Sequence, residues 1–438
     1  MKLIKKVFSI FSALEVIILM IAITVSTFII MPVFAPTETS EEPVSARNLF
    51  PSARAYNTEG KRVDIFDTIF YVRYIQESDT ILNEIVNVLN DYLVPYHKLF
   101  DRHNDYFAVL PVNESAPTYE EKQTLPRLHN LKYVNDHMGQ EVEIAKPLYD
   151  LLSVGLDYTL HTPNNAFNMF IGELYDFWSP HLDIDYDTSE DPLYNPERKA
   201  LLEELVTYIP LTEEEIENTL KLRSEGDKYY VTFNQFNNSG SKLSISVGAI
   251  AKGMMTDILN DALVYRGLTK GFINGGRSSI SFLSDGFAGK PLEITLGDIG
   301  AGADYAFKFT RNGKYQMSTS GIYEGSYFDY EGETIIRSHI INPLTGYPAQ
   351  RNHHVVNLAS DTLSGLELDY LSTSLIVLPE QDGLEFLTTK YGQHDINVVY
   401  GGYEEEGWYI SYNANYPGGN SPSMIVNSQY REKFLDLL

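Results

Sequence analysis

SVGAIAKGMMTD, residues 246–257, places two glycines and a lysine between a segment typical of a strand and a segment typical of a helix. Residues 242–247, KLSISV, alternate apolar and polar side chains, whereas residues 254–267 repeat apolar side chains three and four positions apart. Amide groups at the start of a helix attract phosphate, and glycines let a ligand approach the main chain closely. The stretch therefore predicts a mixed α and β domain with a site for a nucleotide phosphate, although an ordinary strand-to-helix connection with a surface lysine would give the same pattern.

A Walker A loop is excluded by the order of the side chains in this stretch. In that loop the lysine follows the second glycine, and a Ser or Thr then completes a magnesium site. Here Lys252 precedes Gly253, and Met254 and Met255 follow it. Neither methionine has a hydroxyl group to offer, so the stretch is not a Walker A loop.

The composition is that of a large, acidic, folded protein. The 438 residues are 43% hydrophobic and include 31 Tyr and 22 Phe, which is enough for a large core and excludes global disorder. The formal net charge of −26 disfavours nucleic-acid binding, because phosphate neutralisation needs a basic stripe. Without cysteine, the chain forms no disulfide, no thiolate site and no cysteine-linked lipid anchor.

An apolar segment predicts an N-terminal membrane anchor over residues 1–35, a single transmembrane helix. Lysines precede the apolar run and acids follow it, which places the domain outside the cytoplasmic membrane as a single-pass protein. Glu15 interrupts the run and is expected at the interface. A cleaved signal peptide is the alternative, but Pro36 disfavours cleavage after Ala35. The flanking charges are Lys2, Lys5, Lys6, Glu38, Glu41 and Glu42.

The rest of the chain predicts an extracytoplasmic linker over residues 36–60 and a single compact α+β domain over residues 61–438. The linker lacks periodicity and is rich in Pro, Ser, Thr and Glu. The domain shows neither an internal repeat nor a second linker. Helices are expected at residues 78–100, 148–156, 201–222, 254–267 and 366–378, and strands at residues 62–75, 228–234, 241–247, 271–275, 292–298, 305–310, 338–342, 353–359 and 396–402.

Two further polar segments are candidates for ligand binding. Gly275 and Gly276 end a short strand, where a flat ligand could approach the backbone or a plain turn could lie. Residues 317–323 and 338–348 form polar stretches rich in hydroxyl side chains, and the second contains His339. Solvated loops explain these stretches equally well, and a histidine there can also be structural.

The predicted helix at residues 366–378 offers a candidate metal site. Asp369 and Thr373 lie four positions apart and therefore on the same face of the helix. A hard cation such as Mg²⁺ takes carboxylate, hydroxyl and carbonyl oxygens. The alternative is structural: an acid in the first turn is favoured by the helix dipole, and a threonine can bond back to the main chain.

Five segments in order resemble the ApbE-type FAD:protein FMN transferase family, which are flavin transferases. GAIAKGMMTD, NGGRSSI, TSGIY, SHIINPLTGYP and LDYLSTSL are similar to the family blocks GxIAKGxxxD, NxGGN, TSGxY, SHIIDPxTGxP and ADALSTAL. NAFNMFIGELYDFW is only loosely similar to GAFDPTVGPLxxLW. The resemblance runs from about Phe66 to the end of the chain and implies the single mixed α+β domain of that family.

The resemblance implies an FAD site and a Mg²⁺ site. Lys252 would lie beside polar groups of the dinucleotide, and Asp257 would lie towards its adenosine half. The backbone carbonyl of Ala249, with Asp369 and Thr373, would hold Mg²⁺. The residues implied in FAD binding are Gly248, Ala249, Lys252, Gly253, Asp257, Gly275, Gly276, Thr319, Ser320 and Gly321.

The implied reaction breaks the pyrophosphate of FAD, which is the substrate. A Thr or Ser hydroxyl of an acceptor protein attacks the phosphorus on the FMN side, and AMP leaves. Mg²⁺ would neutralise charge on the phosphoryl oxygens, and a base must activate the hydroxyl. His339 falls on the family's functionally important histidine and is the candidate base. The acceptor is expected to be a redox protein with a short flavinylation motif at the same membrane face.

Four positions depart from the family pattern. Ser246, Asn342 and Asn168 stand where the family usually has Asp, and Ile322 stands inside the TSGxY block. The loss of three acids predicts a less acidic site. Two alternatives therefore remain open, an FAD pyrophosphatase that releases FMN and AMP, and a non-catalytic FAD-binding surface protein. The intact metal pair and histidine favour an active transferase.

Overall fold

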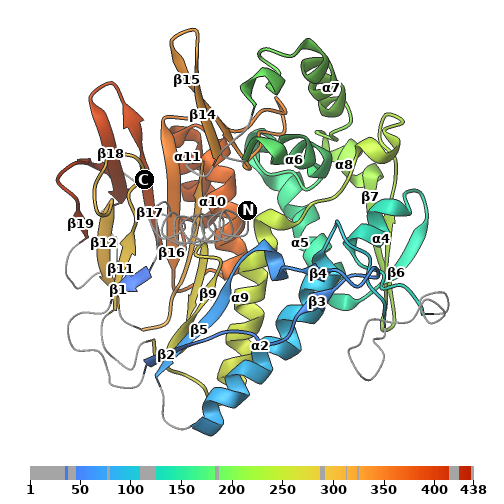
Figure 1. Cartoon of the computed structure of the whole chain (residues 1–438), viewed down its shortest axis with the longest axis horizontal. Helices are drawn as coiled ribbons and strands as arrows, with labels where there is room; N and C mark the ends of the chain where they lie inside the picture. Colours follow the sequence, from blue (N-terminus) through green and yellow to red (C-terminus); the bar gives the residue numbers. More distant parts are fainter. Residues whose placement is uncertain are drawn as a thin grey trace, which may run out of the picture.

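A computed structural model of the chain describes residues 35–37, 46–75, 79–108, 125–182, 187–286, 292–311, 313–322, 325–413 and 424–435 (Figure 1). The predicted anchor, apart from its last residue, lies outside these ranges. Within the described ranges, no helix combines the length and the apolar character needed to cross a membrane.

A nine-stranded sheet forms the centre of the molecule (Figure 1). Its strands pair antiparallel, except for the last pair, which is parallel. Its strands come from early, middle and late parts of the chain, so the sheet joins these parts into one domain. In spatial order the strands are β2 (Ala46–Leu49), β5 (Phe70–Ile75), β9 (Gly271–Gly275), β10 (Ser279–Phe282), β13 (Gln316–Gly321), β16 (His353–Ser360), β17 (Ile396–Glu404), β18 (Gly407–Asn413) and β20 (Arg431–Leu435).

Helices cover one face of this sheet. Helices α9 (Gly248–Tyr265) and α10 (Gly365–Val377) pack on it, and α2 (Asp79–Phe100) packs against α9 (Figure 1). The side chains of Val356 and Leu358 join the apolar core that contains α10, because alternate residues of a strand face the same side. Helix α11 (Glu380–Tyr391) follows α10 after Pro379.

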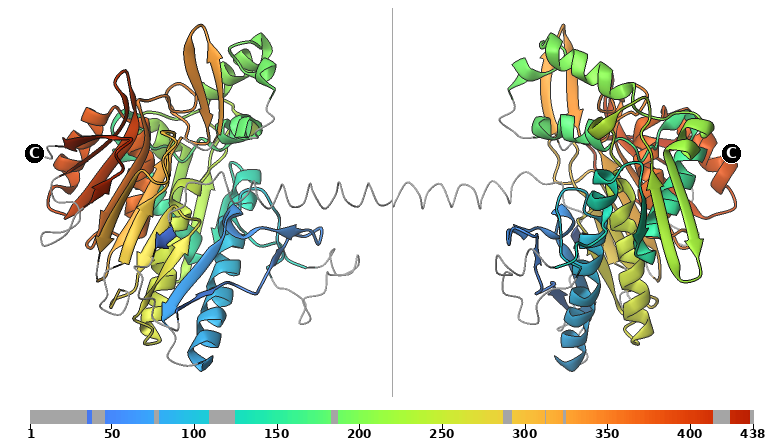
Figure 2. Two further views of the ribbon diagram at one scale, coloured as in Figure 1. Left: turned by 60° about the vertical axis from the view of Figure 1, so that its left-hand side comes forward. Right: turned by 90° about the vertical axis from the view of Figure 1, so that its right-hand side faces the viewer.

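A smaller sheet covers the opposite face. Its strands are β1 (Ala35–Thr37), β11 (Leu292–Leu296), β12 (Phe307–Arg311) and β19 (Ile425–Val426), in that spatial order. Val355 and Ala359 of β16 face this side and pack in one core with Ile294 and Phe307. The molecule therefore has three layers, and Figure 2 shows the strands of the two sheets beside the helices.

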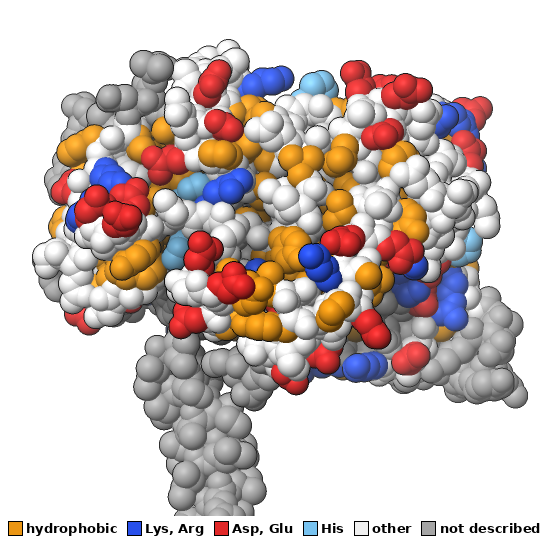
Figure 3. Space-filling view, turned by 90° about the horizontal axis from the view of Figure 1, so that it is seen from above, with side chains coloured by type: hydrophobic (Ala, Val, Ile, Leu, Met, Phe, Trp, Pro, Cys, Tyr) orange, Lys and Arg blue, Asp and Glu red, His pale blue; other side chains and the backbone are white. Residues whose placement is uncertain are grey.

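A lobe of short helices and strands adjoins the helical face (Figure 2). It contains β6 (Glu141–Ile144), β8 (Lys228–Phe233) and β7 (Leu220–Glu225) in one sheet, and helices α4 (Leu131–Asp136), α5 (Lys146–His161), α6 (Gly172–Trp178), α7 (Pro196–Val206) and α8 (Glu213–Thr219). A hairpin of β14 (Gly325–Tyr330) and β15 (Glu333–Ser338) projects beside α7 (Figure 1). Seen from above, this side of the molecule carries acidic and basic side chains interspersed with hydrophobic ones (Figure 3).

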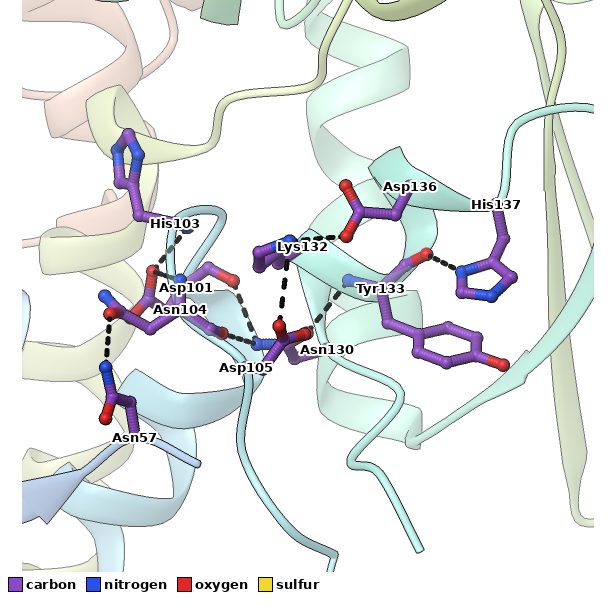
Figure 4. A network of polar contacts seen from close by, with 10 residues as sticks. All are labelled: Asn57, Asp101, His103, Asn104, Asp105, Asn130, Lys132, Tyr133, Asp136 and His137. Carbon is purple, nitrogen blue, oxygen red and sulfur yellow. Dashed lines mark hydrogen bonds and ion pairs between the residues drawn. The ribbon is translucent and has the colours of Figure 1, made fainter. Parts of the chain in front are cut away.

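A polar network joins the end of α2 to α4 (Figure 4). The Asp101 carboxylate accepts hydrogen bonds from the backbone N–H groups of His103 at 2.7 Å and Asn104 at 3.1 Å. The Asn130 side chain donates to the carbonyls of Asp101 and Asn104 and accepts from the backbone of Tyr133. Because Asn130 is fully buried, these bonds fix the lobe to the helical layer.

Several predicted elements are confirmed, among them the helices at residues 78–100, 148–156 and 366–378 and the strands at residues 228–234 and 271–275. The predicted helix at residues 201–222 is wrong: α7 ends at Val206, α8 starts after Thr212, and β7 begins at Leu220. Pro210 lies between the two helices and cannot continue a helix, and Thr212 forms a capping box with Glu215.

Four segments near the expected site also differ from the prediction. The predicted strand at residues 338–342 is wrong beyond Ser338, where β15 ends, and Ile341 forms only an isolated bridge. The segment at residues 241–247 is not a strand and forms only the bridge between Ser244 and Ile171. Helix α9 begins at Gly248 rather than at residue 254, so GAIAKG is its first turns. In the predicted strand at residues 62–75, only the part from Phe70 joins the sheet, because Phe66 adopts a positive φ of 54°.

Part of the predicted linker packs on the domain. Strand β2 pairs with β5 at the edge of the large sheet, and Ala55 is fully buried. Strands β3 (Ala55–Tyr56) and β4 (Arg62–Val63) pair with one another. Ordered structure therefore starts before Lys61, although the division of the whole chain into anchor, linker and domain stays a prediction.

Candidate active site

The crossing of α9 and α10 fixes the centre of the site. An added Cβ on Gly253 would lie 2.2 Å from the Gly365 carbonyl oxygen, so the helices approach as closely as their backbones allow. Asp257 accepts hydrogen bonds from the backbone N–H groups of Gly365 at 2.8 Å and Leu366 at 2.9 Å. One turn further, the Gly253 N–H donates to Asp369 Oδ2 at 2.7 Å. The two helices therefore run antiparallel in this register.

The register brings the three predicted metal ligands together. From Gly253, one turn back along α9 leads to Ala249, and one turn forward along α10 leads from Asp369 to Thr373. In a regular helix the Gly253 N–H points towards the Ala249 carbonyl, so the Asp369 oxygen that accepts from this N–H lies beside that carbonyl. A carbonyl, a carboxylate and a hydroxyl oxygen thus share one end of the helix crossing.

Asp369 is a buried carboxylate with several donors. Its side chain is 4% exposed and accepts from Ser279 Oγ at 2.7 Å and Ser318 Oγ at 2.6 Å, in addition to the Gly253 N–H. Burial raises the pKa of Asp369, while the charge of Lys252 and these donors act in the opposite direction. A cation at this point would favour the ionised carboxylate further.

Hydroxyl groups continue from Asp369 towards Thr373. Ser318 Oγ lies 3.0 Å from Ser372 Oγ, Ser372 Oγ lies 2.8 Å from Ser320 Oγ, and Ser320 Oγ lies 3.3 Å from Thr373 Oγ1. Sequence reasoning missed Ser279 and Ser372. A signal in the sequence existed only for Ser318 and Ser320. They lie two positions apart, and residues with that spacing face the same side of a strand.

His339 and Lys252 complete the site. His339 follows the last residue of β15 and is half-buried. Burial and the neighbouring charge of Lys252 lower the pKa of His339 to about 4, so its imidazole is neutral at pH 7. The same lysine charge acts on Asp369, which places both groups within electrostatic reach of Lys252. Lys252 therefore acts electrostatically on both His339 and Asp369, and the roles of these three residues stay predictions.

The donor set suits a hard cation. One carboxylate, one hydroxyl and one carbonyl oxygen are the ligand types that Mg²⁺ takes in proteins, usually completed by phosphate oxygens. No group of three or more His, Asp or Glu side chains among the described residues could hold a metal ion, so a site here depends on the neutral oxygens of Ala249 and Thr373. These residues fit Mg²⁺, and its binding stays a prediction.

The sequence matches the model of the ApbE family over residues 112–398, which is more than half of the chain. The chain belongs to the ApbE family. This confirms the predicted family, its single mixed α+β domain and the prediction of an enzyme of the flavin-transferase class.

Solved structures of the ApbE family have the same fold. The flavin transferase ApbE from Vibrio cholerae is 17% identical, with a TM-score of 0.57 over 85% of this chain and 98% of that chain. The ApbE protein from Thermotoga maritima is 19% identical, with a TM-score of 0.54 over 82% and 96% of the two chains. The apo flavinyl transferase ApbE from Pseudomonas stutzeri is 15% identical, with a TM-score of 0.53 over 87% and 98%. No curated protein matches the sequence.

Packing explains two of the glycines implied in FAD binding in this ApbE-family chain, Gly275 and Gly276. An added Cβ on Gly275 would lie 2.9 Å from the side chains of Phe70 and Thr256. Gly276 has a φ of +66°, and its Cβ would lie 2.3 Å from Thr68 Oγ1. Packing alone therefore accounts for glycine at both positions, whether or not a ligand binds there. Their role in FAD binding stays a prediction.

Only part of the TSGIY segment faces the helix crossing. Ser320 bonds to α10, whereas Thr319 points to the opposite side of β13, where its Oγ1 accepts from Asn357 Nδ2 at 2.8 Å. Gly321 pairs with Val355 in the sheet. Thr319 and Ser320 therefore face opposite sides of β13, because alternate residues of a strand do so, and their role in FAD binding stays a prediction.

Two of the amides that stand in place of family acids have structural roles in this ApbE-family chain. Asn168 is buried, accepts from the Phe170 N–H at 2.9 Å, and donates to the Pro210 carbonyl at 2.9 Å, which an aspartate could not do. Asn342 Oδ1 accepts from the Leu344 N–H at 3.0 Å and forms the turn that an aspartate would also form. The amides therefore keep the local structure while the negative charge is lost.

Proposed function

We propose that this chain is an FAD:protein FMN transferase that moves FMN from FAD to a Thr or Ser hydroxyl of an acceptor protein and releases AMP. The observation that carries the proposal is the register of α9 and α10. The Gly253 N–H bond to Asp369 and the Gly365 N–H bond to Asp257 define this register, which supports Asp369, Ala249 and Thr373 as the ligands of one cation. The charge of Lys252 acts on both Asp369 and His339, which supports a role for both in the same site.

The start of α9 would receive the pyrophosphate of FAD. Gly248 is exposed at the first residue of this 18-residue helix, where unbonded N–H groups and the helix dipole favour an anion. Lys252 lies one turn further and would attract the phosphate oxygens. Bound by Ala249, Asp369 and Thr373, Mg²⁺ would supply charge neutralisation on the phosphoryl oxygens.

His339 would take the proton of the attacking hydroxyl. The acceptor oxygen forms a bond to the phosphorus on the FMN side, the bond from that phosphorus to the bridging oxygen breaks, and AMP leaves with the electron pair. The proton passes to the imidazole, which is unprotonated at neutral pH because the pKa of His339 is lowered to about 4. Lys252, which contributes to that lowering, would also stabilise the developing negative charge.

The location and the acceptor are part of the proposal. The apolar run at residues 1–35, with lysines before it and acids after it, supports a single-pass anchor in the cell membrane with the domain outside. The acceptor would then be a redox protein at that membrane face, carrying a Thr or Ser flavinylation motif.

One assay tests this function. The full chain in detergent is incubated with FAD, Mg²⁺ and an acceptor domain that carries a flavinylation motif, and in-gel flavin fluorescence and released AMP are measured. A fluorescent acceptor that appears only with Mg²⁺ supports the transferase. AMP without a labelled acceptor supports the FAD pyrophosphatase instead, and bound FAD without either product supports a non-catalytic binder.

A further inference from the structure

A continuous line of hydroxyl groups joins Asp369 to Thr373 beneath the proposed cation site. Ser318 Oγ lies 2.6 Å from Asp369 Oδ1, and the next three oxygen-to-oxygen distances, through Ser372 and Ser320 to Thr373, are 3.0, 2.8 and 3.3 Å. Ser318 is 1% exposed and Ser372 is fully buried, which leaves the inner links away from solvent.

The number of protons on these groups determines which group donates in each hydrogen bond along the line. Each hydroxyl has one proton, and an ionised carboxylate only accepts, so Ser318 donates to Asp369. Ser318 has then used its proton, and Ser372 must be the donor between the two. The other acceptor for Ser372 is the Asp369 carbonyl at 3.2 Å, which also directs its proton inward.

The same reasoning fixes the outer two links. Because the Ser372 proton points inward, Ser320 is the donor to Ser372. Because Ser320 has then used its proton, Thr373 is the donor to Ser320. The Thr373 proton therefore points towards Ser320 of β13, and the lone pairs of Thr373 Oγ1 remain for another partner.

We propose that Ser318, Ser372 and Ser320 are positioning residues that orient the Thr373 hydroxyl for a divalent cation. The proposal rests on the cation site of the proposed function. Without Ser372, Ser320 can turn its proton towards Thr373, and the Thr373 proton then turns towards the cation. Groups that orient a metal ligand in this way typically contribute 10- to 100-fold in metal affinity.

Ser374 provides a matched control. It lies on the same helix, is fully buried, and donates to the Tyr370 carbonyl at 2.8 Å, away from the line that leads to Thr373. Binding of Mn²⁺ to the full chain in detergent is followed by the electron paramagnetic resonance signal of the free ion, without FAD or acceptor. We expect Ser372→Ala to weaken Mn²⁺ binding about tenfold and Ser374→Ala to change it less than about twofold.

A double-mutant cycle separates positioning from packing. In a Thr373→Val background, adding Ser372→Ala should weaken Mn²⁺ binding no further, because the oriented hydroxyl is already absent. The half-buried Ser320 supplies a second variant, Ser320→Ala, if Ser372→Ala does not fold. Unchanged binding in a folded Ser372→Ala or Ser320→Ala variant, or an equal loss in both backgrounds, overturns the positioning role. No Mn²⁺ binding by the wild-type chain overturns the cation site itself.

Discussion

His339 is the residue on which the proposed chemistry depends most directly. Burial and Lys252 lower its pKa to about 4, so the imidazole is neutral and unprotonated at physiological pH, as a general base must be. We expect His339→Gln to slow FMN transfer by about 10²- to 10⁴-fold while FAD binding survives, since a general base contributes that much to rate and glutamine keeps a polar side chain of similar size. AMP release and quenching of FAD fluorescence measure the two effects separately.

The control for this variant is another histidine with the same lowered pKa. His354 is half-buried on β16, its ring contacts Trp408, and burial lowers its pKa to about 4. His354→Gln should leave transfer within about twofold of the wild-type rate, because the His354 ring packs against Trp408 of β18. Loss of both FAD binding and transfer in His339→Gln would assign His339 to binding or folding instead.

A third histidine should govern stability rather than chemistry. His353 is 3% exposed, its Nε2 lies 3.0 Å from the Leu375 carbonyl, and burial lowers its pKa from 6.5 to about 4. Between these two values the unfolded chain binds more protons than the folded chain, so the free energy of unfolding falls as the pH is lowered. The expected loss from this group is about 3 kcal/mol between pH 7 and pH 4.

Urea unfolding at several pH values tests this expectation. The wild-type midpoint should fall as the pH is lowered from 6.5 towards 4, and His353→Gln should show a smaller fall, because glutamine keeps a donor for the Leu375 carbonyl but does not titrate. The same slope in both proteins would show that other groups control stability in this range.

At the scale of elements, the contact between α9 and α10 determines the site. Gly253→Ala would place a Cβ 2.2 Å from the Gly365 carbonyl oxygen, and backbone cannot yield as a flexible side chain can. We expect a loss of about 1–3 kcal/mol in the free energy of unfolding, with weaker Mn²⁺ binding because Asp369 and Ala249 move apart. Chemical denaturation and Mn²⁺ titration measure the two effects.

Gly248→Ala on the same helix is the matched comparison. The nearest atom to an added Cβ is Ser246 Oγ at 3.8 Å, so alanine fits without strain. Stability should stay the same or rise by up to about 1 kcal/mol, because alanine favours a helix over glycine. A similar loss of stability in the two variants would mean that the close approach at Gly253 does not limit the packing.

The same elements show what the sequence could and could not reveal. The start of α10 was predictable, because Ser364 and Glu367 form a capping box. The start of α9 was not, because Val247 precedes Gly248 without a side-chain cap and two glycines in the first turns read as a turn. Element starts are visible in sequence where a side chain marks them and hidden where tertiary packing fixes them.

The same distinction applies to the candidate site: local spacing predicts some of its contacts, and only the tertiary structure reveals the others. Asp369 and Thr373 share a helix face, so their spacing alone paired them. Ser279 reaches Asp369 from another strand because it pairs in register with Ser318, and such pairing between distant segments leaves no mark in a single sequence. The burial of Asp369 could not be predicted from the sequence either, because it depends on residues from the same distant strands.

At the scale of the whole molecule, the three layers support the helix crossing that carries the candidate site. The helices that carry Ala249 and Asp369 pack on a sheet whose strands come from the whole length of the chain. The strands under the crossing, β10 and β13, supply serines to the carboxylate, so the sheet contributes directly to the site. A change at the edge of this sheet should therefore lower the stability of the whole domain, and with it the stability of the helix crossing.

The first strand of the sheet provides a test at this scale. Strand β2 (Ala46–Leu49) covers the edge of β5, and Asn90 of α2 accepts from the backbone N–H groups of Ser52 at 2.8 Å and Ala53 at 2.9 Å. Removing residues 46–60 would uncover this edge and the pocket of the fully buried Ala55. A fragment of residues 61–438 should therefore melt several degrees lower than one of residues 46–438 and aggregate more readily.

Asn90→Ala in the longer fragment gives the intermediate case that shows how the segment acts. It removes the acceptor for Ser52 and Ala53 but leaves the pairing of β2 with β5 intact. If the segment stabilises the domain by being held in place, this variant should melt between the two fragments, because only part of the contact is lost. Circular dichroism melts and size-exclusion chromatography provide the comparison. Identical melting of both fragments would show that residues 46–60 lie on the domain without stabilising it, and the predicted boundary at residue 61 would then enclose the stable domain.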